Sequence, residues 1–139
     1  PPLDMKEKWF AANTAYSMAK FGMSLVVLGL AGELRASKIA VNALWPRTTI
    51  ATSAIKNLLG GDAVMEASRT PDIIADAAHM VFCKSAADCT GNFLIDDTFL
   101  WANGVREFEH YRVNKTVNLM QDFFVPDDSE PPVSLKALK

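Results

Sequence analysis

The sequence predicts an α/β fold in which short parallel strands are buried between helices. Residues 13–34 are predicted to form one long helix, which is almost wholly apolar from Phe21 to Ala31. Residues 38–44 and 92–95 are short apolar runs without strict alternation, which is typical of strands buried in a parallel sheet. Helices and such strands alternate along the chain, and this order indicates the α/β class.

Composition excludes several classes of protein. The 139 residues have room for one ordinary domain, and 14 basic against 16 acidic residues offer no basic surface for nucleic acid. The longest apolar run, Leu25–Ala31, is far shorter than the roughly 20 residues that span a bilayer. The chain does not open on a secretory leader, and Cys83 and Cys89 have no second pair to complete a metal set. We expect an intracellular protein, cytoplasmic or organellar, with no membrane span, no nucleic-acid partner and no metal site.

The predicted first helix begins with two side chains suited to proton transfer, Tyr16 and Lys20. Residues four apart lie on one face of a helix, one turn from each other. The positive charge of Lys20 is expected to lower the pKa of Tyr16 toward neutral pH, which would make the phenol a usable general acid or base. On this spacing alone, the simpler interpretation is a chance meeting of a packed tyrosine and a solvated lysine.

The rest of this helix is apolar on more than one face. Val26, Val27 and Leu28 point in different directions around the helix axis, so the segment needs apolar neighbours on several sides. We expect one face to pack on the sheet and another to pack on a partner subunit. The sequence therefore predicts a homo-oligomer, a dimer or tetramer, that associates through residues 13–34.

The segment after the first predicted strand is the candidate ligand-binding loop. Pro46 ends the strand, and loops beyond the carboxyl ends of parallel strands bind ligands in such sheets. Hydroxyl groups follow at Thr48, Thr49, Thr52 and Ser53. They suit a phosphate or an amide, although ordinary capping and turn formation explain them equally well. Residues 50–59 are predicted to form a short helix that covers a pocket and ends at Gly60 and Gly61.

The second half of the chain supplies a helix, a strand and an irregular end. Residues 70–84 are predicted to be helical, since Thr, Pro and Asp form a strong helix start. Asp96 and Asp97 close the strand at 92–95 and are expected to be solvated turn residues rather than cation ligands. Residues 105–139 are aromatic and irregular, then polar and proline-rich, and we expect an extension that ends in a mobile tail.

The order of these motifs resembles the second half of a short-chain dehydrogenase/reductase. A Tyr-x-x-x-Lys helix, a VNALWP strand, a threonine-rich loop, a TPDIIADA helix and a TGNFLID strand follow one another over about residues 1–100. The sequence is most similar to the hydroxysteroid-dehydrogenase-like branch of that family. The details are AYSMAKFGMS, VNALWPRTTIAT, and an aromatic tail containing Asp122, Phe123 and Phe124.

The resemblance implies a Rossmann-type doubly wound parallel sheet. Residues 1–104 would form the C-terminal half of that domain, and residues 105–139 would form an extension and tail. It also implies hydride transfer between an alcohol and a carbonyl of a small-molecule substrate, with NAD or NADP as the cofactor. The residues that choose between the two cofactors would lie outside this chain.

The resemblance also implies roles for individual residues. Tyr16 would be the general acid/base on the substrate oxygen, and Lys20 would lower its pKa and hold the nicotinamide ribose. Further cofactor contacts are expected at Pro46, Thr49, Ile50 and Thr52. Two departures from the family pattern occur: Arg47 stands where a glycine is usual, and the last strand ends in Asp-Asp-Thr instead of Asp-Gly-Gly.

The glycine-rich phosphate turn and the catalytic serine of the family would lie upstream of Pro1. We therefore expect this chain to be half of a domain that is inactive by itself. The alternative is a non-catalytic fragment or scaffold whose long helix, residues 13–34, mediates dimerisation.

Overall fold

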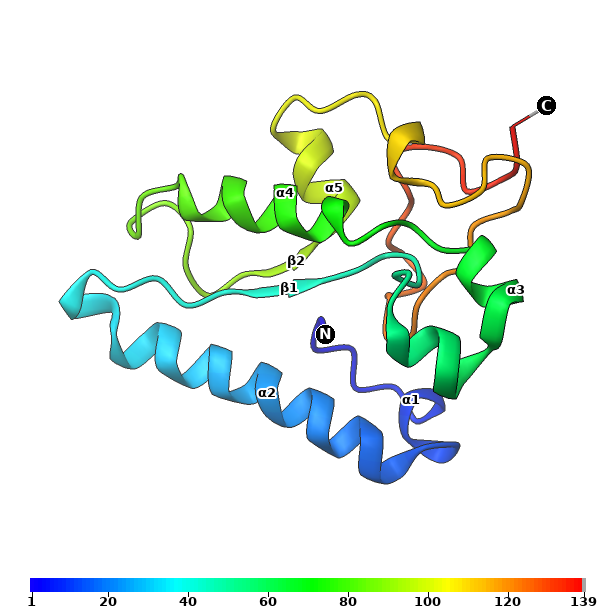
Figure 1. Ribbon diagram of the computed structural model, residues 1–139. Helices are drawn as coiled ribbons and strands as arrows, with labels where there is room; N and C mark the ends of the chain where they lie inside the picture. Colours follow the sequence, from blue (N-terminus) through cyan, green and yellow to red (C-terminus); the bar gives the residue numbers. More distant parts are fainter. Residues whose placement is uncertain (139) are drawn as a thin grey trace.

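Two parallel strands lie at the centre of the fold, with helices on both sides (Figure 1). The computed structural model describes residues 1–138, except for the side chains of Leu58 and Leu59. Strand β1 (Ala43–Trp45) pairs in parallel with β2 (Phe93–Ile95), so that Ala43 lies opposite Phe93. Figure 1 shows α2 on one side of this pair and α4 and α5 on the other. The predicted α/β class with parallel strands is confirmed.

The helices are as follows: α1 (Lys8–Ala11), α2 (Thr14–Glu33), α3 (Gly61–Glu66), α4 (Asp72–Phe82) and α5 (Asp96–Ala102). Short 3-10 turns occur at Arg35–Ser37 and Glu109–Tyr111, and a π-helical turn occurs at Ile55–Leu59. The apolar core between α4, α5 and the segment after them is formed by Ile73, Ala77, Leu100, Phe108 and Tyr111. The helix predicted at 70–84 is observed as the shorter α4, whose Ile73 and Ala77 belong to this core.

Helix α2 agrees closely with the predicted helix at 13–34. Its buried residues recur along one face and are Ser17, Phe21, Ser24 and Ala31. On this face the hydroxyls of Ser17 and Ser24 donate to carbonyl oxygens of the N-terminal segment, those of Trp9 and Pro1. The opposite face is open, with Leu25, Val26 and Leu28 each more than half exposed. By length and composition alone α2 could also cross a membrane, but core helices of soluble proteins can be equally long and apolar. Association through this face stays a prediction.

Three local predictions need correction. The first strand begins at Ala43 instead of residue 38: Lys38 is left-handed (φ 57°) at the end of the 3-10 turn, and the amide of Val41 donates to the Thr90 hydroxyl (3.1 Å) instead of to a strand. The predicted helix at 50–59 begins later, since Ile50 is extended and bridges to Arg69. The glycine pair ends the helical turn only in part: Gly60 caps the π-helical turn that ends at Leu59, whereas Gly61, at φ +61°, opens α3.

The prediction for Asp96 and Asp97 is wrong, and it is the most informative of these corrections. The two residues begin α5 and both are fully buried, whereas the sequence suggested solvated turn residues. The carboxylate of Asp97 pairs with Arg47 (Nε–Oδ1 2.7 Å) and with Arg69 (Nη1–Oδ2 3.1 Å). Both guanidinium groups are also buried. Charges are buried in proteins when they are paired, and the two arginines that pair Asp97 lie 50 and 28 residues away in the sequence.

Arg47 connects the candidate ligand-binding loop to the C-terminal segment. Its Nη2 donates to the hydroxyls of Thr98 (2.7 Å) and Ser129 (3.0 Å), and its Nη1 donates to the carbonyl oxygen of Ser129 (2.7 Å). Its own carbonyl oxygen accepts the amide of Asp122 (2.8 Å). The arginine that replaces the usual glycine is therefore turned inward, where it fixes the chain beyond residue 120.

The C-terminal segment packs against the rest of the molecule instead of forming a free tail. Arg112 donates from Nη2 to the carbonyl oxygens of Ser134 (2.8 Å) and Lys136 (2.9 Å). The amide of Leu119 donates to the carbonyl oxygen of Leu135 (2.7 Å). The irregular backbone expected from residue 105 onward is observed, but its hydrogen bonds tie it down as far as Leu138.

Removal of the buried Asp97 charge is expected to destabilise the protein strongly. Asp97→Asn would leave Arg47 and Arg69 buried without their shared carboxylate, and such losses typically cost about 3–5 kcal/mol. The control is Asp127→Asn, which breaks only exposed ion pairs with Lys6 and Lys8 and should change stability little, because water screens such pairs. Urea unfolding of both variants measures the difference. Equal losses of unfolding free energy in the two variants would contradict a large contribution of the buried ion pairs to stability.

The second buried carboxyl, Asp96, should make stability depend on pH. Burial raises the pKa of Asp96 from 3.8 to about 6, although its Oδ1 accepts the amides of Arg47 and Asp97. A raised folded-state pKa means that this group stabilises the fold fully below pH 3.8 and loses that contribution as the pH rises through 6.

Asp96→Asn keeps the accepting oxygen and removes the charge. The stability of the variant relative to the wild type should therefore increase as the pH rises. Two pKa units correspond to about 2.7 kcal/mol, and we expect the difference in unfolding free energy to change by roughly 2 kcal/mol between pH 4 and pH 7. Other carboxyls titrate in both proteins and cancel in this comparison. A difference that stays constant over this range would exclude a raised pKa at Asp96.

Candidate active site

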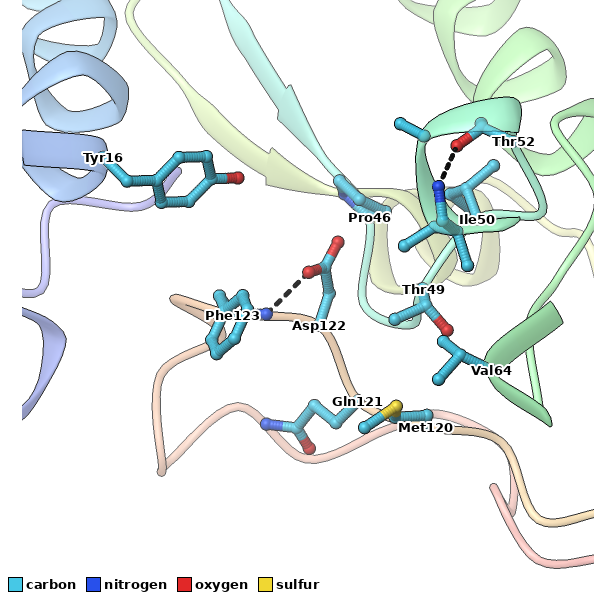
Figure 2. A pocket seen from close by; sticks show the side chains of 12 residues that line it. Tyr16, Pro46, Thr49, Ile50, Thr52, Val64, Met120, Gln121, Asp122 and Phe123 are labelled. Carbon is cyan, nitrogen blue, oxygen red and sulfur yellow. Dashed lines mark hydrogen bonds between the residues drawn. The ribbon is translucent and has the colours of Figure 1, made fainter. Parts of the chain in front are cut away.

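A pocket of about 360 Å³ lies where α2, the loop after β1 and the C-terminal segment meet (Figure 2). It is lined by Tyr16, Pro46, Thr49, Ile50, Thr52, Ala54, Ile55, Val64, Met120, Gln121, Asp122 and Phe123. All of the site residues expected from the sequence, apart from Lys20, are in this set. Residues from three distant parts of the sequence therefore meet around one cavity.

The loop that carries Pro46 and Thr52 is held by backbone pairing on both sides. The amide of Thr49 donates to the carbonyl oxygen of Met120 (3.0 Å), and Thr48 bridges Gln121 in antiparallel fashion. On the other side, the amide of Arg69 donates to the carbonyl oxygen of Thr49 (3.0 Å). The loop is thus held by isolated β-bridges on both sides, although its sequence suggested only turns and caps.

The polar groups of the loop differ in their availability to a ligand. The hydroxyl of Thr49 is buried and hydrogen bonded to that of Ser68 (2.8 Å), so it does not face the cavity as a free group. The hydroxyl of Thr52 accepts a long hydrogen bond from the amide of Ile55 (3.4 Å). The amide of Ile50 has no acceptor among the described residues. Ile50 therefore offers a free backbone donor beside the pocket.

Tyr16 enters the pocket from α2. Its ring stacks on that of Phe124 (centroids 5.9 Å apart, planes at 19°), and its hydroxyl points away from the helix toward Pro46 (Figure 2). The side chain is 45% exposed, so the hydroxyl is open to a ligand. Phe124 itself is buried against Trp9, Phe21 and other rings. The ring of Tyr16 is thus held by packing, whereas its hydroxyl is free to bind a ligand.

The expected effect of Lys20 on Tyr16 is wrong for this chain. Burial, and second the negative charge of Asp122, raise the pKa of the Tyr16 phenol above its usual value. The Lys20 ammonium lies over the aromatic rings, 5.5 Å from the Tyr16 centroid and 6.0 Å from that of Trp45. In the described part of the chain it makes no hydrogen bond to the phenol. The charge is near the ring rather than paired with the oxygen.

The wall opposite Tyr16 was not predicted as part of a site. Met120, Gln121, Asp122 and Phe123 all line the pocket, about a hundred residues after Tyr16 in the sequence. Desolvation raises the pKa of the Asp122 carboxyl to about 6, while the amide of Phe123 and the charge of Lys20 act in the opposite direction. The only sequence signal was the aromatic character of this segment, which does not indicate where it packs.

The left-handed backbone of Phe124 directs this wall into the pocket. Its φ of 63° is unusual for a bulky residue, and the position is held by its buried ring and by the hydrogen bond from Trp45 Nε1 to the carbonyl oxygen of Phe123 (2.7 Å). Such strain persists only where the surroundings enforce it, and it often accompanies functional sites. Here the turn leaves Asp122 and Phe123 facing the cavity.

Comparison with known proteins supplies the family. No family model matches the chain. Hydroxysteroid dehydrogenase-like protein 2 of Rattus norvegicus is 46% identical over 127 residues, which is 91% of this chain and 24% of the rat protein. The protein of the same name from Danio rerio is 44% identical over the whole chain, which corresponds to 32% of its own length.

Solved structures agree with the sequence comparison. The crystal structure of a putative dehydrogenase from Xanthomonas campestris matches with a TM-score of 0.85 and 46% identity, over 91% of this chain and 46% of the other. A short chain dehydrogenase from Mycobacterium thermoresistibile matches with a TM-score of 0.82 and 44% identity, over 95% of this chain and 46% of the other. The chain thus spans about a third or less of these curated relatives and under half of the solved ones. By sequence and by fold, this chain corresponds to the C-terminal half of a short-chain dehydrogenase/reductase and is most like the hydroxysteroid dehydrogenase-like branch.

Proposed function

We propose that the protein carrying this chain is an NAD(P)-dependent oxidoreductase that interconverts an alcohol and a carbonyl, with Tyr16 as the general acid/base. The observation that carries the proposal is the open Tyr16 hydroxyl on the same pocket as the loop from Pro46 to Thr52. Its relatives are dehydrogenases, which supports the oxidoreductase class. They favour an enzyme over a scaffold that only dimerises through α2.

The residues around the pocket fit the nicotinamide end of such a cofactor. The free amide of Ile50 and the hydroxyl of Thr52 suit a carboxamide, and the ammonium of Lys20 suits ribose hydroxyls. Apolar side chains of Ile50, Ile55 and Val64 form much of the remaining wall. When bound, the cofactor supplies or accepts the hydride at the substrate carbon. The choice between NAD and NADP is not determined by these residues.

The chain's own part in the reaction is the movement of one proton. In the reducing direction Tyr16 Oη donates its proton to the substrate oxygen, so that the carbonyl becomes an alcohol when its carbon receives the hydride. The pKa of Tyr16 is raised by burial and by Asp122, so the phenol carries its proton at neutral pH, as donation requires, but is a weaker acid than a free phenol. Oxidation needs the phenolate, which burial and the Asp122 carboxylate both oppose.

The pocket walls indicate the general shape of the substrate. Ile50, Ile55, Val64, Met120 and Phe123 surround the cavity with apolar surface. A small carbonyl compound with a bulky apolar body would bury that surface and exclude water from the reacting oxygen. The substrate is thus proposed to be a small organic molecule.

Tyr16→Phe in the protein carrying this chain is expected to lower kcat by about 100-fold or more with little change in KM, because general acid catalysis typically contributes that much. Turnover of a panel of ketones and aldehydes with NADH and NADPH, followed by nicotinamide absorbance, measures the effect. Tyr111→Phe is a matched control, since this other tyrosine lies in the core and donates to Asp76 (2.6 Å). It should lower stability and leave kcat within about twofold. Full turnover by Tyr16→Phe would exclude Tyr16 as the acid.

A further inference from the structure

The geometry points to Asp122 as a specificity-determining residue that accepts a hydrogen bond from a hydroxyl group on the substrate. This inference rests on the oxidoreductase function proposed above. The substrate class would then be hydroxyketones: an apolar body, a reacting carbonyl near Tyr16, and a second oxygen that carries a hydroxyl proton. In the opposite direction the corresponding substrates are diols.

The first observation is the position of the carboxylate. Asp122 lines the pocket together with Tyr16, and Figure 2 shows its side chain projecting from the C-terminal segment toward Pro46. Its Oδ1 accepts the amide of Phe123 (2.7 Å). Its Oδ2 accepts no hydrogen bond from the residues that the structure describes. One oxygen is thus used by the protein, and the other is available to a ligand.

The second observation is that this carboxylate is held in place. The amide of Asp122 donates to the carbonyl oxygen of Arg47 (2.8 Å), whose side chain belongs to the buried ion cluster. On one side Gln121 bridges Thr48, and on the other Phe124 is buried among aromatic rings. Both neighbours are therefore fixed. An acceptor fixed in advance discriminates between ligands better than one that can turn back to water.

The third observation is the contrast between Asp122 and its surroundings. The neighbouring walls are mainly apolar, including Ile50, Val64 and Phe123. A charged acceptor in such a pocket loses hydration when an apolar ligand enters, unless the ligand supplies a donor. A ligand hydroxyl restores the lost hydrogen bond, whereas the same ligand without the hydroxyl leaves the carboxylate unpaired. Sites built in this way reject the ligand that lacks the donor.

The charges nearby favour a neutral hydroxyl over other donors. Lys20 lies close enough to favour the ionised form of Asp122, yet its ammonium is over the rings of Tyr16 and Trp45. No hydrogen bond joins Lys20 to Asp122 among the described residues. A substrate ammonium would meet the positive charge of Lys20, and a substrate carboxylate would meet the negative charge of Asp122. A hydroxyl avoids both repulsions.

The test uses matched pairs of ketones that differ by one hydroxyl. The probes are 2-hydroxyacetophenone against acetophenone, and 3-hydroxypropiophenone against propiophenone, which place the hydroxyl at two distances from the carbonyl. Dissociation constants for the protein carrying this chain are measured by calorimetry, and turnover with NADH and NADPH is followed separately. A hydrogen bond to a charged group predicts a preference of roughly tenfold to a hundredfold for at least one hydroxylated probe.

Variants assign that preference to Asp122. Asp122→Leu should abolish the preference while still binding the plain ketone, and Asp122→Asn, which keeps the accepting oxygen, should retain part of it. Asp128→Leu removes an exposed acid from the same segment and should leave the preference unchanged.

The inference is overturned if the wild type shows no preference in either pair, if it binds none of the probes, or if Asp122→Leu keeps the preference. Failure of the proposed function would be seen differently, as the absence of hydride transfer to every probe and every carbonyl of the panel. Turnover without an Asp122-dependent preference would therefore leave the oxidoreductase standing and reject only the substrate class.

Discussion

The buried ion cluster of Asp97 with Arg47 and Arg69 is the interaction on which the rest of the structure depends. It joins the end of β1, the start of α5 and the chain before α4, and through Ser129 it reaches the C-terminal segment. Of these elements, the loop after β1 and the C-terminal segment line the pocket. Because charges are stable in a protein interior only when paired in a defined geometry, the cluster allows few alternative arrangements. The candidate site is built on this fixed base.

Much of the architecture could be predicted from the sequence. The long helix and the two parallel strands follow from patterns of apolar residues, and such patterns report burial directly. The pocket residues Tyr16, Pro46 and Thr52 could be proposed because strand ends and helix spacing are local features that meet at a predictable edge of the sheet. The family resemblance rested on the same local motifs, and the similarity to dehydrogenases confirms it.

The rest depends on contacts between residues far apart in sequence. Nothing local distinguishes a buried Asp97 from a solvated one, since its partner Arg47 lies 50 residues away. The C-terminal wall was missed for the same reason: a polar, irregular segment gives no periodic signal, although Asp122 lies opposite Tyr16 in the pocket. The pKa of Tyr16 was misjudged because spacing on a helix fixes which residues are near, whereas burial and Asp122 decide the direction of the shift.

The central claim is that a substrate oxygen binds at Tyr16, between α2 and the C-terminal segment. A crystal structure of the protein carrying this chain, with an oxidised nicotinamide cofactor and a bound ketone, tests it most directly. The ketone oxygen is expected within about 2.6–3.2 Å of Tyr16 Oη, the range required for proton transfer. The nicotinamide is expected beside Ile50. A ketone oxygen bound elsewhere, with Tyr16 Oη facing solvent, would contradict the account.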